Sequence, residues 1–96
     1  MDRHVEAFLE MLAAERGAAR NTLAAYRADL EDAAGFASRK AGEAPGAMSA
    51  ETLRRYVTGL TDAGLSPRTA ARRLSALRQF HRFLAREGVR ADDPTE

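Results

Sequence analysis

Apolar residues recur along this chain at the three- and four-residue spacing of a helix, and no stretch alternates as a strand does. In residues 3–16 the apolar positions Val5, Phe8, Leu9 and Leu12 lie on one face of a helix. The same spacing returns in about residues 21–41, 50–63 and 67–87. The pattern therefore predicts an all-α fold, a compact bundle of four helices joined by short loops.

Residues that favour helix ends stand at the borders of these segments. Ser49 and Ser66 precede the third and fourth segments, where a hydroxyl accepts from free backbone N–H groups, and Pro67 suits the first helical position. Asn21 stands where the second segment begins, and we expect its amide to cap that helix. A glycine follows each segment: Gly17, Gly42, Gly64 and Gly88.

The fourth segment has an apolar side and a basic side. Residues Ser66–Leu84 contain five arginines and no acidic residue. Leu77 and Leu84 lie on the apolar side with His81, which we expect to be a packed ring with one hydrogen bond rather than a ligand or a base. We expect the guanidinium groups of the opposite side to point outward together, without a carboxylate partner in the same molecule.

Charge is divided unevenly along the chain, although the formal net charge is only +1. Residues 1–48 hold six basic and eight acidic residues, whereas residues 49–96 hold nine basic and six acidic residues. A local basic face suits a polyanionic partner better than the overall balance indicates. Arginine supplies 14 of the 15 basic residues, so a compositional bias that only solvates a helix face is the alternative.

The composition excludes several kinds of chemistry. The chain has no cysteine for a disulfide or a thiolate metal site, and its two histidines lack the spacing of metal ligands. No glycine-rich phosphate loop occurs, and no serine has the histidine and acid of an activated nucleophile. We therefore expect no catalytic site, no metal and no cofactor. Without a long apolar run or a signal peptide, we also expect a cytoplasmic protein with no membrane partner.

Guanidinium and hydroxyl groups near helix starts suit phosphate oxygens, and arginine can also grip guanine N7 and O6 with both arms. The candidate DNA-contacting residues are Arg20, Asn21, Thr22, Tyr26, Arg27, Ser66, Arg68, Thr69, Arg72, Arg73, Ser75 and Arg78. The cluster of Arg68, Arg72 and Arg73 favours DNA. Arg82 and Arg86 instead favour solvation or pairing with an acid such as Glu87.

Two residue pairs leave other interpretations open. For Asn21 and Thr22, simple capping of the helix is favoured over contact with a phosphate. Tyr26 lies on the apolar stripe of its segment, so its ring is expected in the core with only the hydroxyl reaching outward. Arg27 lies one position further round, on the polar border.

Three stretches of the chain resemble the N-terminal core-binding domain of the tyrosine recombinases, the SAM-like module of the phage integrase family. They are NTLAAYRADLEDAAGFA, SPRTAARRLSALRQFHRFLAREG and ADDP. The resemblance covers essentially all 96 residues in order, and it is greatest to the recombinases that resolve chromosome dimers. It implies a helical core-binding domain over residues 1–90, with residues 91–96 starting the linker to a catalytic domain.

The resemblance also implies a function. Members of this family hold DNA in a C-shaped clamp, in which the second and fourth helices of this domain approach the major groove. These correspond here to Arg20–Arg27 and Ser66–Arg78. The implied partners are double-stranded DNA and, in a synaptic tetramer, a second copy or a paralogous recombinase. The family's catalytic residues belong to the second domain, so we expect this chain to be catalytically silent. A helical protein–protein interaction module is the alternative, because SAM-like folds serve both purposes.

Overall fold

The computed structural model describes residues 2–96 and consists of four α-helices with one short 3₁₀ helix. The helices are α1 (Arg3–Arg16), α2 (Arg20–Ala41), α3 (Ala50–Asp62) and α4 (Pro67–Arg86), and the 3₁₀ helix η1 (Pro45–Ala47) lies between α2 and α3. Residues 2–96 contain no strand, which confirms the predicted all-α bundle. Within the same residues, no helix has the length and apolar character needed to cross a lipid bilayer.

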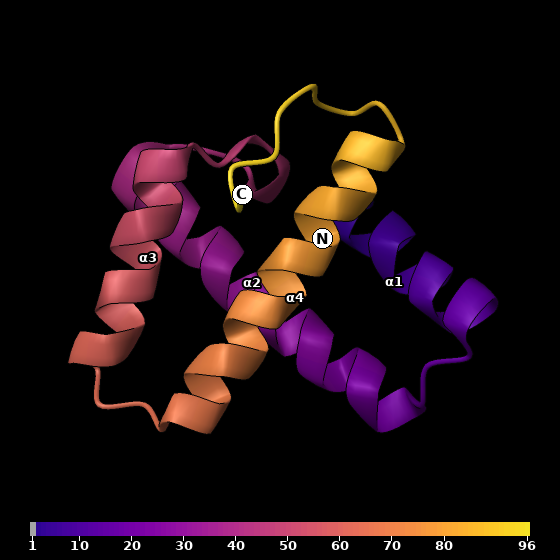
Figure 1. The fold of residues 1–96 in the computed structure, drawn as a ribbon, viewed down its shortest axis with the longest axis horizontal. Helices are drawn as coiled ribbons and strands as arrows, with labels where there is room; N and C mark the ends of the chain where they lie inside the picture. The colour runs from indigo at the N-terminus through magenta and orange to yellow at the C-terminus, as the bar shows by residue number, and fades with distance from the viewer. Residues whose placement is uncertain (1) are drawn as a thin grey trace.

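The bundle is organised around the crossing of α2 and α4. Figure 1 shows α4 passing in front of α2 near the centre, with α1 on one side and α3 on the other. Both central helices contact α1 and α3, and η1 packs against α1 and α2. The residues of α4 therefore have neighbours on three sides, and its remaining side faces solvent.

The apolar faces predicted from the sequence form the core. The Phe8 ring on α1 lies 5.7 Å from each of the rings of Phe80 and Phe83 on α4, measured between centroids. Leu77 and Leu84 of α4 are buried with them. Alanines at the helix contacts, such as the fully buried Ala33, Ala37 and Ala76, let the helices approach closely.

Most of the predicted helix ends are confirmed. Ser49 and Ser66 accept hydrogen bonds from the backbone N–H groups of Thr52 (3.1 Å) and Thr69 (3.2 Å). Gly42 ends α2 with a φ of 64°, a left-handed conformation that side chains other than glycine rarely adopt.

The start of α2 differs from the prediction. The helix begins at Arg20, its N-cap is Ala19, and no side chain caps it. Asn21 is already inside the first turn, two residues beyond the N-cap position from which its amide could act. The prediction that Asn21 caps α2 is therefore wrong, and its side chain is exposed.

His81 is buried as expected but makes no hydrogen bond. Its side chain has no exposed surface, and neither ring nitrogen has a partner among the residues described. The Phe80 ring lies 5.2 Å away, measured between ring centroids. Burial, assisted by the nearby charge of Arg90, lowers the pKa of His81 from 6.5 to about 4. The imidazole is therefore neutral at physiological pH.

The chain after α4 turns back over the bundle (Figure 1). Arg90 Nη1 donates to the carbonyl oxygens of Gly46 (3.1 Å) and Met48 (2.9 Å), and the same guanidinium binds Asp92. Pro94, Thr95 and Glu96 line a shallow pocket together with residues of α3. A domain boundary near residue 90 stays a prediction.

Candidate nucleic-acid interface

Ion pairs join α4 to α2 where the two helices cross. Arg72 donates from Nε to Asp29 Oδ2 and from Nη2 to Asp29 Oδ1, both at 2.9 Å. Arg73 Nη1 donates to Asp32 Oδ2 at 2.8 Å, and its Nε lies 3.7 Å from Asp29 Oδ1. The Asp29 side chain is only 2% exposed, whereas that of Arg72 is 47% exposed. The two arginines therefore neutralise a carboxylate that would otherwise be buried without a partner.

The expectation that the arginines of α4 lack acidic partners is therefore wrong for Arg72 and Arg73. Their partners stand on another helix, 43 and 41 residues earlier in the chain. The physical reason is that α4 packs on α2 with these polar side chains in contact, which the composition of α4 alone does not reveal. The uncompensated positive charge of α4 must lie elsewhere along the helix.

Tyr56 of α3 completes this polar cluster. Its hydroxyl donates to Asp32 Oδ2 at 2.6 Å, so the Asp32 carboxylate contacts both α3 and α4. The ring packs against Phe36 of α2, with 5.3 Å between centroids. Burial and the neighbouring Asp32 carboxylate raise the pKa of Tyr56 above its usual value. A buried phenol that keeps its proton is a structural group here.

Arg27 is also engaged within the molecule. Its Nη2 donates to Glu6 Oε1 of α1 at 3.0 Å, and its Nη1 contacts the other oxygen of the same carboxylate. The hydrogen bonds from Arg27 hold the pKa of Glu6 below its usual range. Arg27 therefore links α1 to α2, which the sequence did not indicate.

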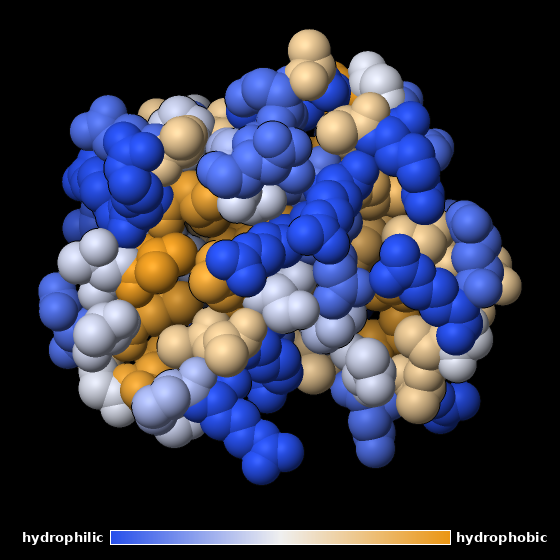
Figure 2. Space-filling view, in the orientation of Figure 1, coloured by the Kyte–Doolittle hydropathy of each residue, from blue (hydrophilic) through white to orange (hydrophobic). Residues whose placement is uncertain are grey.

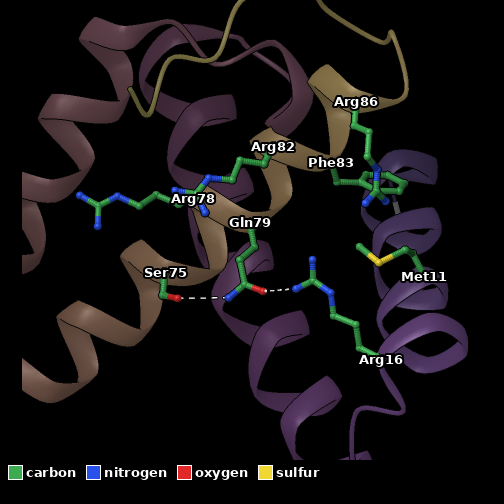
Figure 3. Close-up of a pocket in the computed structure, with 8 residues that line it drawn as sticks. All are labelled: Met11, Arg16, Ser75, Arg78, Gln79, Arg82, Phe83 and Arg86. Atoms are coloured by element: carbon green, nitrogen blue, oxygen red, sulfur yellow. Dashed lines mark hydrogen bonds between the residues drawn. The ribbon is translucent and has the colours of Figure 1, made fainter.

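A groove rich in arginine lies between α4 and the end of α1 (Figure 3). Its volume is about 540 Å³, and no acidic residue lines it. We call it the basic groove. Its lining residues are Met11, Arg16, Ser75, Arg78, Gln79, Arg82, Phe83 and Arg86.

Gln79 organises the middle of the basic groove. Figure 3 shows it between Ser75 and Arg16, with hydrogen bonds to both. Its Oε1 accepts from Arg16 Nη1 at 3.1 Å, and its Nε2 donates to Ser75 Oγ at 3.2 Å and to the Tyr26 hydroxyl at 3.0 Å. The expectation that the Tyr26 hydroxyl reaches outward from a packed ring agrees with this contact, because it meets the polar edge of α4.

The arginines of the basic groove differ in how far they are neutralised. Arg78 and Arg82 are exposed, and neither has an ion-pair partner among residues 2–96. Arg86 lies 3.8 Å from Glu87 and above the Phe83 ring, as the sequence favoured. Arg82, which was expected to be solvated or paired, is exposed, has no acidic partner among residues 2–96 and lines the groove. The groove therefore keeps a positive charge that the molecule does not cancel.

The other candidates divide into two groups. Ser66 and Thr69 serve the α4 cap, because Ser66 Oγ accepts from the Thr69 N–H and donates to Thr69 Oγ1 at 3.0 Å. The second group is exposed and has no side-chain hydrogen bond within the described part of the chain. Its members are Arg20, Asn21, Thr22 and Arg68.

Four polar residues of the groove were not among the candidate DNA-contacting residues: Arg16, Gln79, Arg82 and Arg86. Gln79 and Arg82 lie on the same helical stripe as Arg68, Arg72 and Ser75, so their spacing was a usable signal. Arg16 sits in the last turn of α1, and only the packing of α1 beside α4 brings it to the groove.

The surface of this side of the molecule is polar across α4. Figure 2 shows strongly hydrophilic side chains running from the centre of the face toward the α1 side. Apolar surface appears mainly toward α3 in the same view. On this face, hydrophilic surface over α4 therefore lies beside more apolar surface.

Comparison with known proteins finds similarity to the N-terminal part of tyrosine recombinases. It is 59% identical over 90 residues to the tyrosine recombinase XerD of Caulobacter vibrioides (strain ATCC 19089 / CIP 103742 / CB 15), covering 94% of this chain and 29% of that protein. It is 55% identical to the XerD of Rhizobium meliloti (strain 1021), covering 96% and 29%, and 52% identical to the tyrosine recombinase XerC of Erythrobacter litoralis (strain HTCC2594), covering 95% and 28%.

The chain thus spans less than a third of the length of these relatives. No solved structure matches it. Residues 5–88 match the family described as phage integrase, N-terminal SAM-like domain. Because that match runs from the first turns of α1 to the end of α4, the chain belongs to the family of phage integrase N-terminal SAM-like domains.

Proposed function

We propose that this chain is the DNA-binding domain of a XerD-like site-specific tyrosine recombinase and that it covers one face of the target duplex. The observation that supports this most strongly is a set of guanidinium groups that have no acidic partner among residues 2–96. They lie at the end of α1, the start of α2 and along α4, and they are Arg16, Arg20, Arg68, Arg78 and Arg82.

The charge of a DNA backbone fits such a surface. Arginine presents a planar fork of donors to phosphate oxygens, and each phosphate that it neutralises releases condensed counterions. Two acidic residues of α2, Asp29 and Asp32, do not oppose the duplex strongly, because they are already paired with Arg72 and Arg73. The unpaired arginines supply attraction, and the paired ones neutralise these two carboxylates.

We infer the role of the whole protein from the names of its relatives. The matched proteins are named tyrosine recombinases, so we place strand cleavage and rejoining in a second domain beyond the linker that residues 91–96 begin. This chain then binds DNA without cutting it. Its partners are double-stranded DNA and, in a synaptic tetramer, a second copy or a XerC-like paralogue.

The salt dependence of binding tests this function. The 96-residue chain is titrated with a fluorescently labelled duplex at several salt concentrations, and binding is followed by anisotropy. Five neutralised phosphates predict a slope of about −4 to −5 for log affinity against log salt. Undetectable binding at low salt, or an affinity that is flat with salt, would contradict DNA binding and favour a protein–protein interaction module.

Single substitutions then locate the surface. Arg78→Ala and Arg82→Ala should each weaken binding and make the salt slope shallower by about 1. Arg55→Ala on α3 is the matched control, because Arg55 is also exposed and has no ion-pair partner in the described residues. If Arg55→Ala has the same effect as the groove substitutions, binding depends on net charge alone and the basic groove is not the interface.

A further inference from the structure

We propose that Asp29 is a positioning residue for DNA contact: it holds the Arg72 guanidinium in one orientation and leaves the remaining donors of that group free for two acceptors on the duplex. This inference rests on the proposed DNA-binding function. The ion pair at the crossing of α2 and α4 then belongs to the interface, in addition to neutralising charge.

The hydrogen-bond inventory of Arg72 supports this role. A guanidinium carries five N–H donors. Asp29 takes one from Nε and one from Nη2. The other donor of Nη2 and both donors of Nη1 have no acceptor among the residues described. Three donors in one plane are enough for a two-armed contact with a phosphate or with guanine N7 and O6.

Asp29 is buried and Arg72 is half-exposed, and this difference holds the Arg72 guanidinium in one orientation. Asp29 is 2% exposed and lies on α2 inside the helix crossing, so its carboxylate cannot turn to water. Arg72 is 47% exposed, so the part of its guanidinium away from Asp29 reaches solvent. The hydrogen bond to Asp29 also raises the pKa of Arg72, and the group stays charged. A long side chain that would otherwise sample many rotamers is therefore held before DNA arrives.

Arg72 also lies on the basic side of α4. It lies one turn after Arg68 and one turn before Ser75 on the stripe of α4 that continues to Gln79 and Arg82. Its side chain therefore leaves α4 on the stripe that continues into the basic groove. The unpaired arginines attract the polyanion, and the paired arginine offers donors in a defined direction.

A double-mutant cycle tests the coupling between the two residues. The probe is a duplex that the wild-type 96-residue chain enriches from a random-sequence library. Affinity for it is measured for wild type, Asp29→Asn, Arg72→Ala and the double variant, with thermal melts to confirm that each is folded. We expect Asp29→Asn to weaken binding on the order of fivefold in the wild-type background and to have almost no effect when Arg72 is already alanine.

Any other pattern of affinities in this cycle overturns the inference. If Asp29→Asn strengthens binding only when Arg72 is present, Asp29 withholds the arginine from DNA. If it strengthens binding in both backgrounds, Asp29 only repels the duplex. If it lowers the melting temperature and leaves affinity unchanged, the pair only fastens α2 to α4.

A second variant decides the matter if Asp29→Asn does not fold. Arg72→Lys keeps the charge but cannot bind Asp29 with two donors and present a planar fork to DNA. We expect it to lose about as much affinity as Arg72→Ala, and wild-type affinity in Arg72→Lys would overturn the inference. A wild-type chain that binds no duplex refutes the proposed function as well, whereas binding with independent effects of Asp29 and Arg72 refutes only this inference.

Discussion

The domain should lose stability when the pH falls from 7 to 4.5, and replacing His81 with leucine should abolish most of that loss. The His81 ring is fully buried on α4, and neither nitrogen has a hydrogen-bond partner in the described structure. Burial lowers its pKa from 6.5 to about 4, and the charge of Arg90 acts in the same direction against the weaker opposing effects of Asp93 and Asp92. The folded state therefore holds the neutral imidazole over most of this pH range.

The size of the effect follows from the two pKa values. The unfolded chain takes up the proton near pH 6.5, whereas the folded chain does so only near pH 4. Between these values the unfolded state binds more protons, so the free energy of unfolding falls as the pH falls. One pKa unit corresponds to about 1.4 kcal/mol, so about 2–3 kcal/mol is lost by pH 4.5. That is a large share of the roughly 5–15 kcal/mol that stabilises a typical domain.

Urea unfolding followed by circular dichroism measures this loss in wild type and in His81→Leu. The wild-type free energy of unfolding should drop steeply below pH 6.5, and that of the leucine variant should change little until the carboxylates begin to titrate. The pKa values of Glu6 and Asp92 lie below their usual values of 4.5 and 3.8, so these ion pairs stabilise the folded state at neutral pH and lose most of that contribution only at about pH 4.5 and below. Parallel curves for the two proteins, or an NMR titration of the His81 imidazole near pH 6.5, would refute the reasoning.

Two further predictions concern the stability of the bundle. Leu77→Ala removes a side chain that is 1% exposed and should cost about 2–5 kcal/mol, seen as a lower melting temperature with unchanged DNA affinity of the folded protein. Ser66→Ala removes the cap of α4 and should cost about 1 kcal/mol in chemical unfolding. Equal stability of Ser66→Ala and wild type would mean that Pro67 alone is sufficient to start this helix.

The sequence predicts the helices well because their signals are local. The apolar spacing, the serines before α3 and α4 and the glycine after α2 each act within a few residues, and the structure confirms them. Asn21 shows the limit of such signals. Asparagine favours caps, yet Asn21 is the second residue of α2. Propensity does not say which residue begins the first turn.

The candidate site was less predictable because its contacts are distant in sequence. Arg72 and Asp29 are separated by 43 residues, and periodicity assigns each to a face without revealing which faces meet. The same limit hid Arg16, which reaches Gln79 across 63 residues. The missing hydrogen bond of His81 has a related cause, because a sequence shows that a position is buried but not which atoms surround it.

The ion pairs at the helix crossing have a consequence for how the bundle selects one arrangement. Contacts between alanines tolerate sliding, since a shift of one turn replaces one small side chain by another. A shift of α4 by one turn, about 5.4 Å, would place Ala76 or Arg68 where Arg72 now meets Asp29. With Ala76 in that place, a buried carboxylate would face a methyl group, at a large cost in free energy. A shift in the other direction would keep an arginine, Arg68, beside Asp29 but would replace Arg73 by Thr69 beside Asp32. We therefore expect Asp29 and Asp32 together to select one register of α4 on α2.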